Sequence, residues 1–121
     1  MEQPKTLRVL VVDDEEIVRY TIEMILEHLG HQAHCVGEGN SGLKALETKH
    51  FDAAIVDIRM PGLDGIDFLS LAWEIQPGIP VIMVSGHASE EIRDKVLQAG
   101  ALAFLAKPFQ ISDLEQLLKK I

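Results

Sequence analysis

The sequence predicts an α/β fold in which helices cover both faces of a parallel β-sheet. The first observation is a set of short apolar runs, at residues 7–12, 53–56 and 81–84, each of which stops abruptly at a polar residue. Continuous apolar runs of this length suit strands that are buried on both faces. The second observation is that apolar residues recur at helical spacing between the runs. This alternation of strand and helix predicts a parallel sheet with right-handed crossovers.

Two further strands complete a set of five. Residues 101–105 (ALAFL) form a short apolar run just before Ala106, Lys107 and Pro108. Residues 32–36 (QAHCV) are more polar, which is typical of an edge strand.

Five helices are expected from apolar spacing and from stop signals. The first carries a stripe spaced by four, three and four residues and ends at Gly30: Val18, Ile22, Ile25 and Leu29. The second opens at Asn40 or Ser41, and the fourth follows Ser89 as its N-cap. The remaining stripes are Leu43 and Leu46; Phe68, Leu69, Ala72 and Ile75; Ile92, Val96 and Ala99; and Leu114, Leu117, Leu118 and Ile121.

Composition narrows the class of protein. The 121 residues suit one domain, expected over residues 1–121, and 47% of them are hydrophobic. The formal net charge of −8 repels a phosphate backbone, so direct nucleic-acid binding is not expected. Cys35 is the single cysteine, which excludes an internal disulfide and suits a reducing compartment. With no signal-peptide core and no apolar run of bilayer length, we expect a cytoplasmic protein away from membranes.

Polar residues that could take part in binding or catalysis follow the apolar runs directly. Asp13 and Asp14 follow the first run, Asp57 the third, Ser85 the fourth, and Lys107 comes just after the fifth. The carboxyl ends of parallel strands meet at one edge of the sheet, where ligands bind in open α/β folds. We therefore expect three carboxylates, one hydroxyl and one ammonium group in the same crevice.

A crevice with three carboxylates needs a cation. Two carboxylates about 4 Å apart repel by roughly 4 kcal/mol at an effective dielectric constant near 20. Oxygen ligands favour Mg²⁺, or Mn²⁺ in its place, and Lys107 adds one further positive charge. Such a site would neutralise a transferring phosphoryl group while a carboxylate attacks phosphorus. Asp57 is the expected nucleophile, because it stands alone whereas Asp13 and Asp14 form a chelating pair.

Four segments in order resemble one protein family. They are VVDDE at 11–15, DIRMPGLDG at 57–65, VSGH at 84–87 and FLAKPF at 104–109. Over nearly its whole length the chain resembles the receiver domains of response regulators in two-component signalling, within the chemotaxis-regulator-like superfamily. The resemblance implies a doubly wound, five-stranded (βα)5 fold of the flavodoxin-like type with strand order 2-1-3-4-5.

The resemblance also implies roles for the residues at the strand ends. Asp57 would accept a phosphoryl group from a sensor histidine kinase, a phosphotransfer protein or a small phosphodonor. Asp14 would bind Mg²⁺ directly, Asp13 mainly through water, and Asp57 and the backbone carbonyl of Arg59 would complete the metal site. Lys107 would hold a phosphoryl oxygen.

The remaining implied roles concern switching and lifetime. Ser85 would move to bond another phosphoryl oxygen while Phe104 swings inward. Arg59 and His87 stand where relatives tune the lifetime of the phosphorylated state, and the peptide bond from Lys107 to Pro108 would be cis. The domain would catalyse only its own phosphorylation and dephosphorylation.

The signal would leave through the fourth helix, the fifth strand and the fifth helix, to control an output domain or a partner. A homodimer through these elements is one such partner. The run at 57–62 also resembles transcriptional regulators of the ATPase-activator class, which indicates a transcriptional output.

A stand-alone receiver, acting as a protein-interaction module, is an open alternative to control of an attached output domain. Three other functions fit this sequence less well. A degenerate receiver would bind a partner without phosphorylation, but the acids, Ser85 and Lys107 are all present. A Mg²⁺-dependent aspartyl-phosphate phosphatase needs a second carboxylate two residues after its nucleophile, where this chain has Arg59. A flavin-binding module needs a phosphate loop after the first strand, where this chain has acids.

Two other sequence patterns resemble known ligand-binding motifs. Residues 37–42 match the G-x-G-x-x-G pattern of dinucleotide-binding loops, but the preceding strand is polar rather than central and buried. His28, His31, His34 and Cys35 could suggest a zinc site. Gly30 separates the first two histidines, and His31 and His34 would point to opposite faces of a strand, so scattered surface histidines are the better interpretation.

Overall fold

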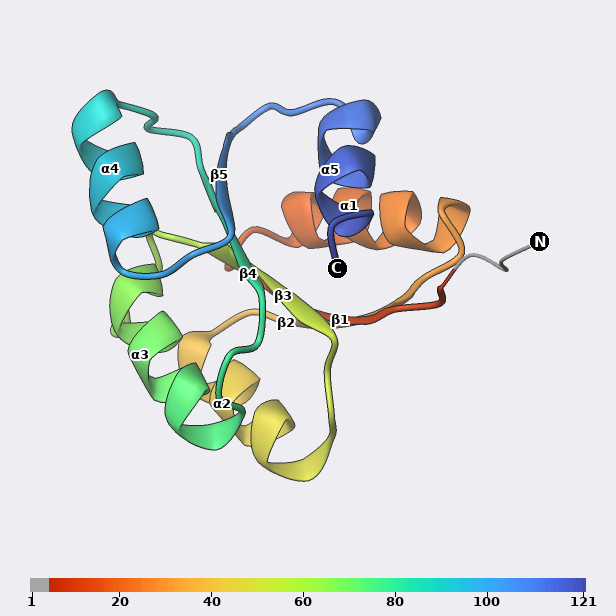
Figure 1. The fold of residues 1–121 in the computed structure, drawn as a ribbon, viewed down its shortest axis with the longest axis horizontal. Coiled ribbons are helices and arrows are strands. Elements are labelled where there is room, and N and C mark those ends of the chain that lie inside the picture. The colour runs from red at the N-terminus through yellow and green to blue at the C-terminus, as the bar shows by residue number, and fades with distance from the viewer. Residues whose placement is uncertain (1–4) are drawn as a thin grey trace.

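Strands and helices alternate along the whole described chain. Figure 1 shows the computed structural model, which describes residues 5–121. The elements are β1 (Arg8–Val12), α1 (Glu16–His28), β2 (Gln32–Val36), α2 (Gly39–Thr48), β3 (Ala53–Asp57), α3 (Gly65–Ile75), β4 (Val81–Ser85), α4 (Glu90–Gln98), β5 (Ala103–Ala106) and α5 (Ile111–Leu118). None of the helices in this part of the chain has the length and hydropathy needed to cross a bilayer.

The five strands form one parallel sheet in the order β2-β1-β3-β4-β5. The expected fold class and strand order are therefore confirmed. The chain runs from β1 outward to β2, and then returns past β1 to place β3 on its other side. This reversal lies between the ends of β1 and β3, where open α/β sheets form their ligand crevices.

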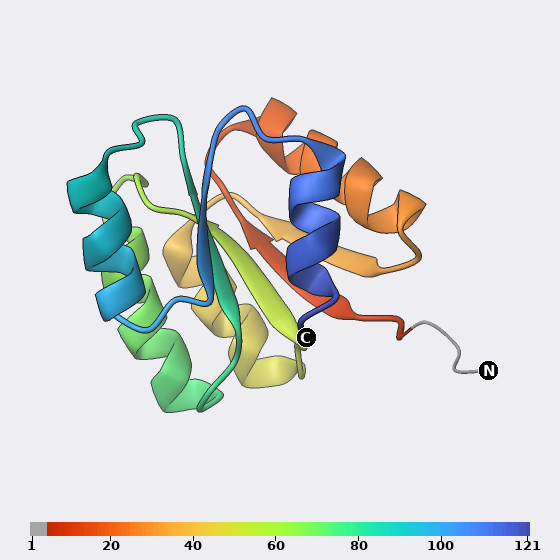
Figure 2. The same cartoon turned by 45° about the horizontal axis from the view of Figure 1, so that its top comes forward.

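Helices cover both faces of the sheet, as Figure 2 shows, and the buried side chains form two separate cores. Helices α1 and α5 pack on one face against residues such as Val9 and Val11 of β1. Helices α2, α3 and α4 pack on the other face against residues such as Leu10 and Val12. Successive residues of β1 from Val9 to Val12 thus enter opposite cores, which is why this part of the strand is continuously apolar rather than alternating.

Some element ends differ from the sequence expectation. Helix α3 begins at Gly65, three residues before its apolar stripe, because the Asp64 side chain accepts the backbone N–H of Asp67 at 2.9 Å. Helix α5 ends at Leu118, so Ile121 lies beyond the helix in which it was expected. Ser89 caps α4 as predicted, since its hydroxyl accepts the backbone N–H of Ile92 at 3.2 Å.

Strand β5 also begins later than its apolar run suggested. Its first residue is Ala103 rather than Ala101. The backbone N–H of Ala101 still bonds to the carbonyl of Val96 in α4, at 3.3 Å. Ala101 therefore belongs to the turn that closes the helix, and the sheet begins only after it.

Candidate functional site

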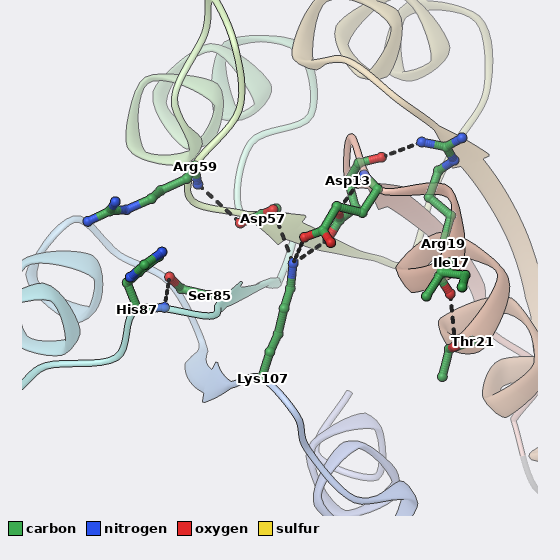
Figure 3. A network of polar contacts seen from close by, with 10 residues as sticks. Asp13, Ile17, Arg19, Thr21, Asp57, Arg59, Ser85, His87 and Lys107 are labelled. Atoms are coloured by element: carbon green, nitrogen blue, oxygen red, sulfur yellow. Dashed lines mark hydrogen bonds and ion pairs between the residues drawn. The ribbon is translucent and has the colours of Figure 1, made fainter.

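The strand ends bring the predicted polar residues together at one edge of the sheet. Asp13 follows β1, and Asp57 is the last residue of the neighbouring strand β3. Ser85 is the last residue of β4 and pairs with Ala106 at the end of β5, so that Lys107 comes next. Figure 3 shows their side chains converging from these separate elements.

Lys107 is the electrostatic centre of this group. Its Nζ lies 2.8 Å from Asp13 Oδ2, 3.1 Å from Asp57 Oδ2 and 3.6 Å from Glu15 Oε1. Burial alone would lower the pKa of Lys107, but hydrogen bonds from its ammonium group to Asp13 and Asp57 raise that pKa above its ordinary value. The lysine therefore stays charged, and this single cation forms ion pairs with three carboxylates.

The surroundings of Asp57 disfavour its negative charge. The residue is only 5% exposed, and its Oδ1 accepts the backbone N–H of Arg59 at 3.1 Å. Burial raises the pKa of the Asp57 carboxyl above 3.8, although the Lys107 hydrogen bond lowers it, and the charge of Asp13 raises it further. Asp57 thus carries negative charge that Lys107 does not fully balance.

The carboxylates form a group with metal-binding geometry. One oxygen from each of Asp13, Asp14, Glu15 and Asp57 lies within 4.8 Å of all the others, and no other group of three or more such ligands occurs within residues 5–121. Asp13 and Asp57 are buried, whereas Asp14 and Glu15 are exposed to solvent. Glu15 was not predicted as a ligand, although it belongs to the acidic run that begins at Asp13.

The residues expected to switch come from the neighbouring strands β4 and β5. The Ser85 side chain is buried, and its oxygen accepts the backbone N–H of His87 at 3.0 Å. Phe104 is half-buried and packs against the core beneath α2, α3 and α4. The peptide bond from Lys107 to Pro108 is cis, as the resemblance implied.

The glycines of the G-x-G-x-x-G pattern have a packing role. A Cβ atom at Gly39 would lie 2.8 Å from the Leu63 side chain, and one at Gly42 would lie 2.9 Å from the Phe68 ring. Gly39 thus lets α2 approach the loop before α3, and Gly42 lets it approach α3 itself. Close packing of α2 therefore accounts for these two glycines without a nucleotide.

The histidines and Cys35 are dispersed among unrelated contacts. His31 Nδ1 accepts the backbone N–H of Leu7 at 3.0 Å, and burial lowers the pKa of His31. The His34 ring lies against Phe51, with 5.8 Å between the ring centres. No zinc-type group of histidine and cysteine occurs in the described part of the chain, which agrees with the sequence interpretation.

Comparisons with known proteins give one consistent family. The family model described as the response regulator receiver domain matches residues 9–119. The chain is 38% identical over 108 residues, 86% of its length, to the sensory/regulatory protein RpfC of Xanthomonas campestris pv. campestris. It is 35% identical over 112 residues, 93% of its length, to the DNA-binding transcriptional regulator NtrC of Salmonella typhimurium. The match spans only 15% and 24% of the lengths of these two relatives.

A solved structure agrees in fold. The receiver domain of sensor histidine kinase PA1611 from Pseudomonas aeruginosa PAO1 superimposes with a TM-score of 0.85 and 30% sequence identity. The alignment covers 96% of this chain and 97% of that one, whose structure has a magnesium ion coordinated in the active site cleft. Receiver domains are signalling modules rather than enzymes that turn over a substrate. The carboxylates at the β1 and β3 ends, the strand order and the matched segment together show that this chain belongs to the response regulator receiver domain family.

Proposed function

We propose that residues 1–121 form a receiver domain that accepts a phosphoryl group on Asp57 in a Mg²⁺-dependent reaction. The observation that carries this proposal is the position of Asp57, a buried carboxylate held between the Lys107 ammonium group and a cluster of acids at the sheet edge. In its ionised form, paired with Lys107, this carboxylate is itself the nucleophile and needs no base to activate it.

The transfer exchanges one bond to phosphorus for another. A carboxylate oxygen of Asp57 forms the new P–O bond, while the P–N bond of a donor phosphohistidine breaks and the leaving imidazole takes up a proton from solvent. Lys107 is fixed within 3.1 Å of Asp57, so its charge is in place where the phosphoryl oxygens would lie. The buried Ser85 hydroxyl, on the neighbouring strand end, is our candidate for a second oxygen contact.

The acidic cluster fits a hard divalent cation. Four carboxylate oxygens within 4.8 Å of one another supply the ligand type that Mg²⁺ prefers, and the two exposed members leave room for bound water. Asp13, Asp14 and Asp57 would hold the ion, directly or through water, together with the Arg59 carbonyl; Mn²⁺ would substitute. When bound, the ion neutralises charge on the transferring phosphoryl group. Glu15 is an additional ligand candidate.

An apolar groove beside the site suits a protein donor. The groove has a volume of about 450 Å³ and runs along α1 to Lys107, with a lining that includes Val18, Pro108 and Phe109. Ile17 on its rim is 78% exposed. We propose that a sensor histidine kinase or a phosphotransfer protein docks here, because apolar contact would exclude water while its phosphohistidine reaches Asp57.

Phosphorylation would change the face formed by α4, β5 and α5, and partners would respond to that change. This face carries the exposed residues Leu97 and Leu102, and its groove is lined by charges of both signs, including Arg93 and Asp113. Phe104 lines the same groove and, with Ser85, is our candidate for the switch element. We propose that this face contacts an output domain, a partner or a second copy of the chain, and that transcription is the controlled process, as in the NtrC relative.

Arg59 and His87 remain our candidates for setting the lifetime of the phosphorylated state. In the view of Figure 3 their side chains lie on the side of Asp57 away from Asp13. From this position they could limit the approach of water to an acyl phosphate.

The proposal is tested by intact-mass measurement after incubation with acetyl phosphate. Wild type should gain one phosphoryl mass with Mg²⁺ present and none with EDTA. Asp57→Asn should gain none under either condition. A gain of equal size in Asp57→Asn, or no gain in wild type with Mg²⁺, would refute phosphorylation at Asp57.

A further inference from the structure

The two aspartates after β1 are held in very different ways. The Asp13 side chain is fixed on both oxygens, because Oδ1 accepts the backbone N–H of Glu15 at 2.9 Å and Oδ2 accepts from Lys107 at 2.8 Å. Asp14 is exposed, and its side chain makes no hydrogen bond or ion pair with any residue in 5–121. The orientation of the Asp14 carboxylate therefore depends on the backbone that carries it.

One side chain forms a direct hydrogen bond to that backbone. Arg19, in the first part of α1, donates from Nη1 to the backbone carbonyl of Asp13 at 2.8 Å. This carbonyl belongs to the peptide group that joins Asp13 to Asp14. The preceding peptide is held by the sheet, since the Asp13 N–H bonds to the Val36 carbonyl at 3.2 Å. Figure 3 shows the guanidinium group reaching over the turn from the side opposite Lys107.

We propose that Arg19 is a positioning residue for the divalent cation. By fixing the plane of the peptide between Asp13 and Asp14, it presents the Asp14 carboxylate toward the other acids before the ion arrives. A charged donor on a carbonyl makes a stronger hydrogen bond than a neutral one, so the peptide is held firmly. This inference rests on the proposed Mg²⁺ site and adds an outer residue that is needed to form it.

The turn after β2 leaves space for this interaction. A Cβ atom at Gly37 would lie 3.1 Å from Arg19 Nη1, which is closer than ordinary packing and would push the guanidinium aside by a few tenths of an ångström. Glycine at this position therefore keeps Arg19 on the Asp13 carbonyl. Gly37→Ala is a second way to disturb the contact while leaving the charge of Arg19 in place.

Charge and position predict opposite effects of removing Arg19. As a cation close to the acids, Arg19 repels a second cation, so its loss should tighten Mg²⁺ binding if only charge matters. If Arg19 instead orients Asp14, its loss should weaken Mg²⁺ binding. The sign of the change therefore separates the two roles.

The experiment measures Mg²⁺ affinity of the unphosphorylated protein by isothermal titration calorimetry, under conditions where circular dichroism shows every variant folded. We expect Arg19→Met to bind Mg²⁺ about tenfold more weakly than wild type, the lower end of the loss seen when an outer partner of a metal ligand is removed. Arg19→Lys keeps a charged donor and should recover part of the affinity. Lys44→Met removes an exposed cation from α2 as the matched control, and its affinity should be unchanged or slightly tighter.

Gly37→Ala should weaken binding by a smaller factor in wild type, and should have no further effect in Arg19→Met, because the two changes act on one contact. Unchanged or tighter binding in Arg19→Met would overturn the inference. Should that variant not fold, unchanged binding in Gly37→Ala would overturn it instead. Failure of wild type to bind Mg²⁺ would count against the proposed function itself, so the two failures are distinguishable.

Discussion

At the scale of single residues, the site is organised around a deficit of positive charge. Lys107 contacts three carboxylates, two of which are buried. The pKa of Asp57 is raised by its burial and by Asp13, despite the hydrogen bond from Lys107. A cation that enters this site would offset part of the unbalanced negative charge and would therefore stabilise the folded state.

Asp57→Asn should therefore stabilise the protein when no metal is bound. The folded-state pKa of Asp57 lies above its ordinary value of 3.8, so the folded state holds this proton more tightly than the unfolded state. Ionised Asp57 consequently destabilises the fold at neutral pH, and this penalty disappears as the pH falls through the raised pKa. In EDTA at neutral pH, urea unfolding should show a gain of about 0.5–2 kcal/mol for Asp57→Asn.

The control for this prediction is Asp94→Asn, an exposed carboxylate on α4 that should change stability little. Saturating Mg²⁺ should shrink the advantage of Asp57→Asn, because the ion stabilises wild type more than a variant that lacks one ligand. Lower stability of Asp57→Asn in EDTA would contradict the charge deficit.

At the scale of elements, apolar spacing predicted which helices exist better than where they end. The stripe of α3 starts at Phe68, whereas the helix starts at Gly65, because Asp64 provides a cap that apolar spacing cannot reveal. The capping hydroxyl of Ser89 could be predicted, since a serine followed by two glutamates is a strong start signal. Helix ends thus depend on polar side chains, and only some of these leave a recognisable pattern.

The turn that follows α4 packs closely against a side chain of α3. Gly100 follows α4 with φ at +110°, and a Cβ atom there would lie 2.7 Å from the Trp73 ring. Trp73 is also held from its other side, because its Nε1 donates to the Ile79 carbonyl at 2.8 Å. The tryptophan therefore has little room to move away from the turn.

Alanine substitutions at two helix ends should separate backbone strain from this clash. Gly30 follows α1 with φ at +88° and has no neighbour within 4 Å of a built Cβ, so Gly30→Ala should cost roughly 1–2 kcal/mol from backbone strain alone. Gly100→Ala should cost about 1–3 kcal/mol more, the usual penalty of overpacking. Because Trp73 is the only tryptophan, its fluorescence should shift in Gly100→Ala and stay unchanged in Gly30→Ala. Equal stability losses would contradict the packing of Trp73 on the turn.

At the scale of the whole molecule, the strand order determines which residues meet at the site. Asp13 and Asp57 meet because β1 and β3 are neighbours at the reversal in strand order, although 44 residues separate them in the chain (57 minus 13). Polar residues at the strand ends could therefore be predicted from where the apolar runs stop. The contributions of Glu15 and Arg19 could not, because they depend on how the turn after β1 folds back over the sheet edge.

The central claim is that this shared edge makes Asp57, and no other carboxylate, the phosphoryl acceptor. The most direct measurement treats the protein with acetyl phosphate and Mg²⁺, reduces it with sodium borohydride, and sequences its peptides by mass spectrometry. Borohydride converts an aspartyl phosphate to homoserine, which marks the residue that was modified. We predict homoserine at position 57 alone, and none when EDTA replaces Mg²⁺. Homoserine at position 13 or 14, or modification that does not depend on the metal, would contradict the account.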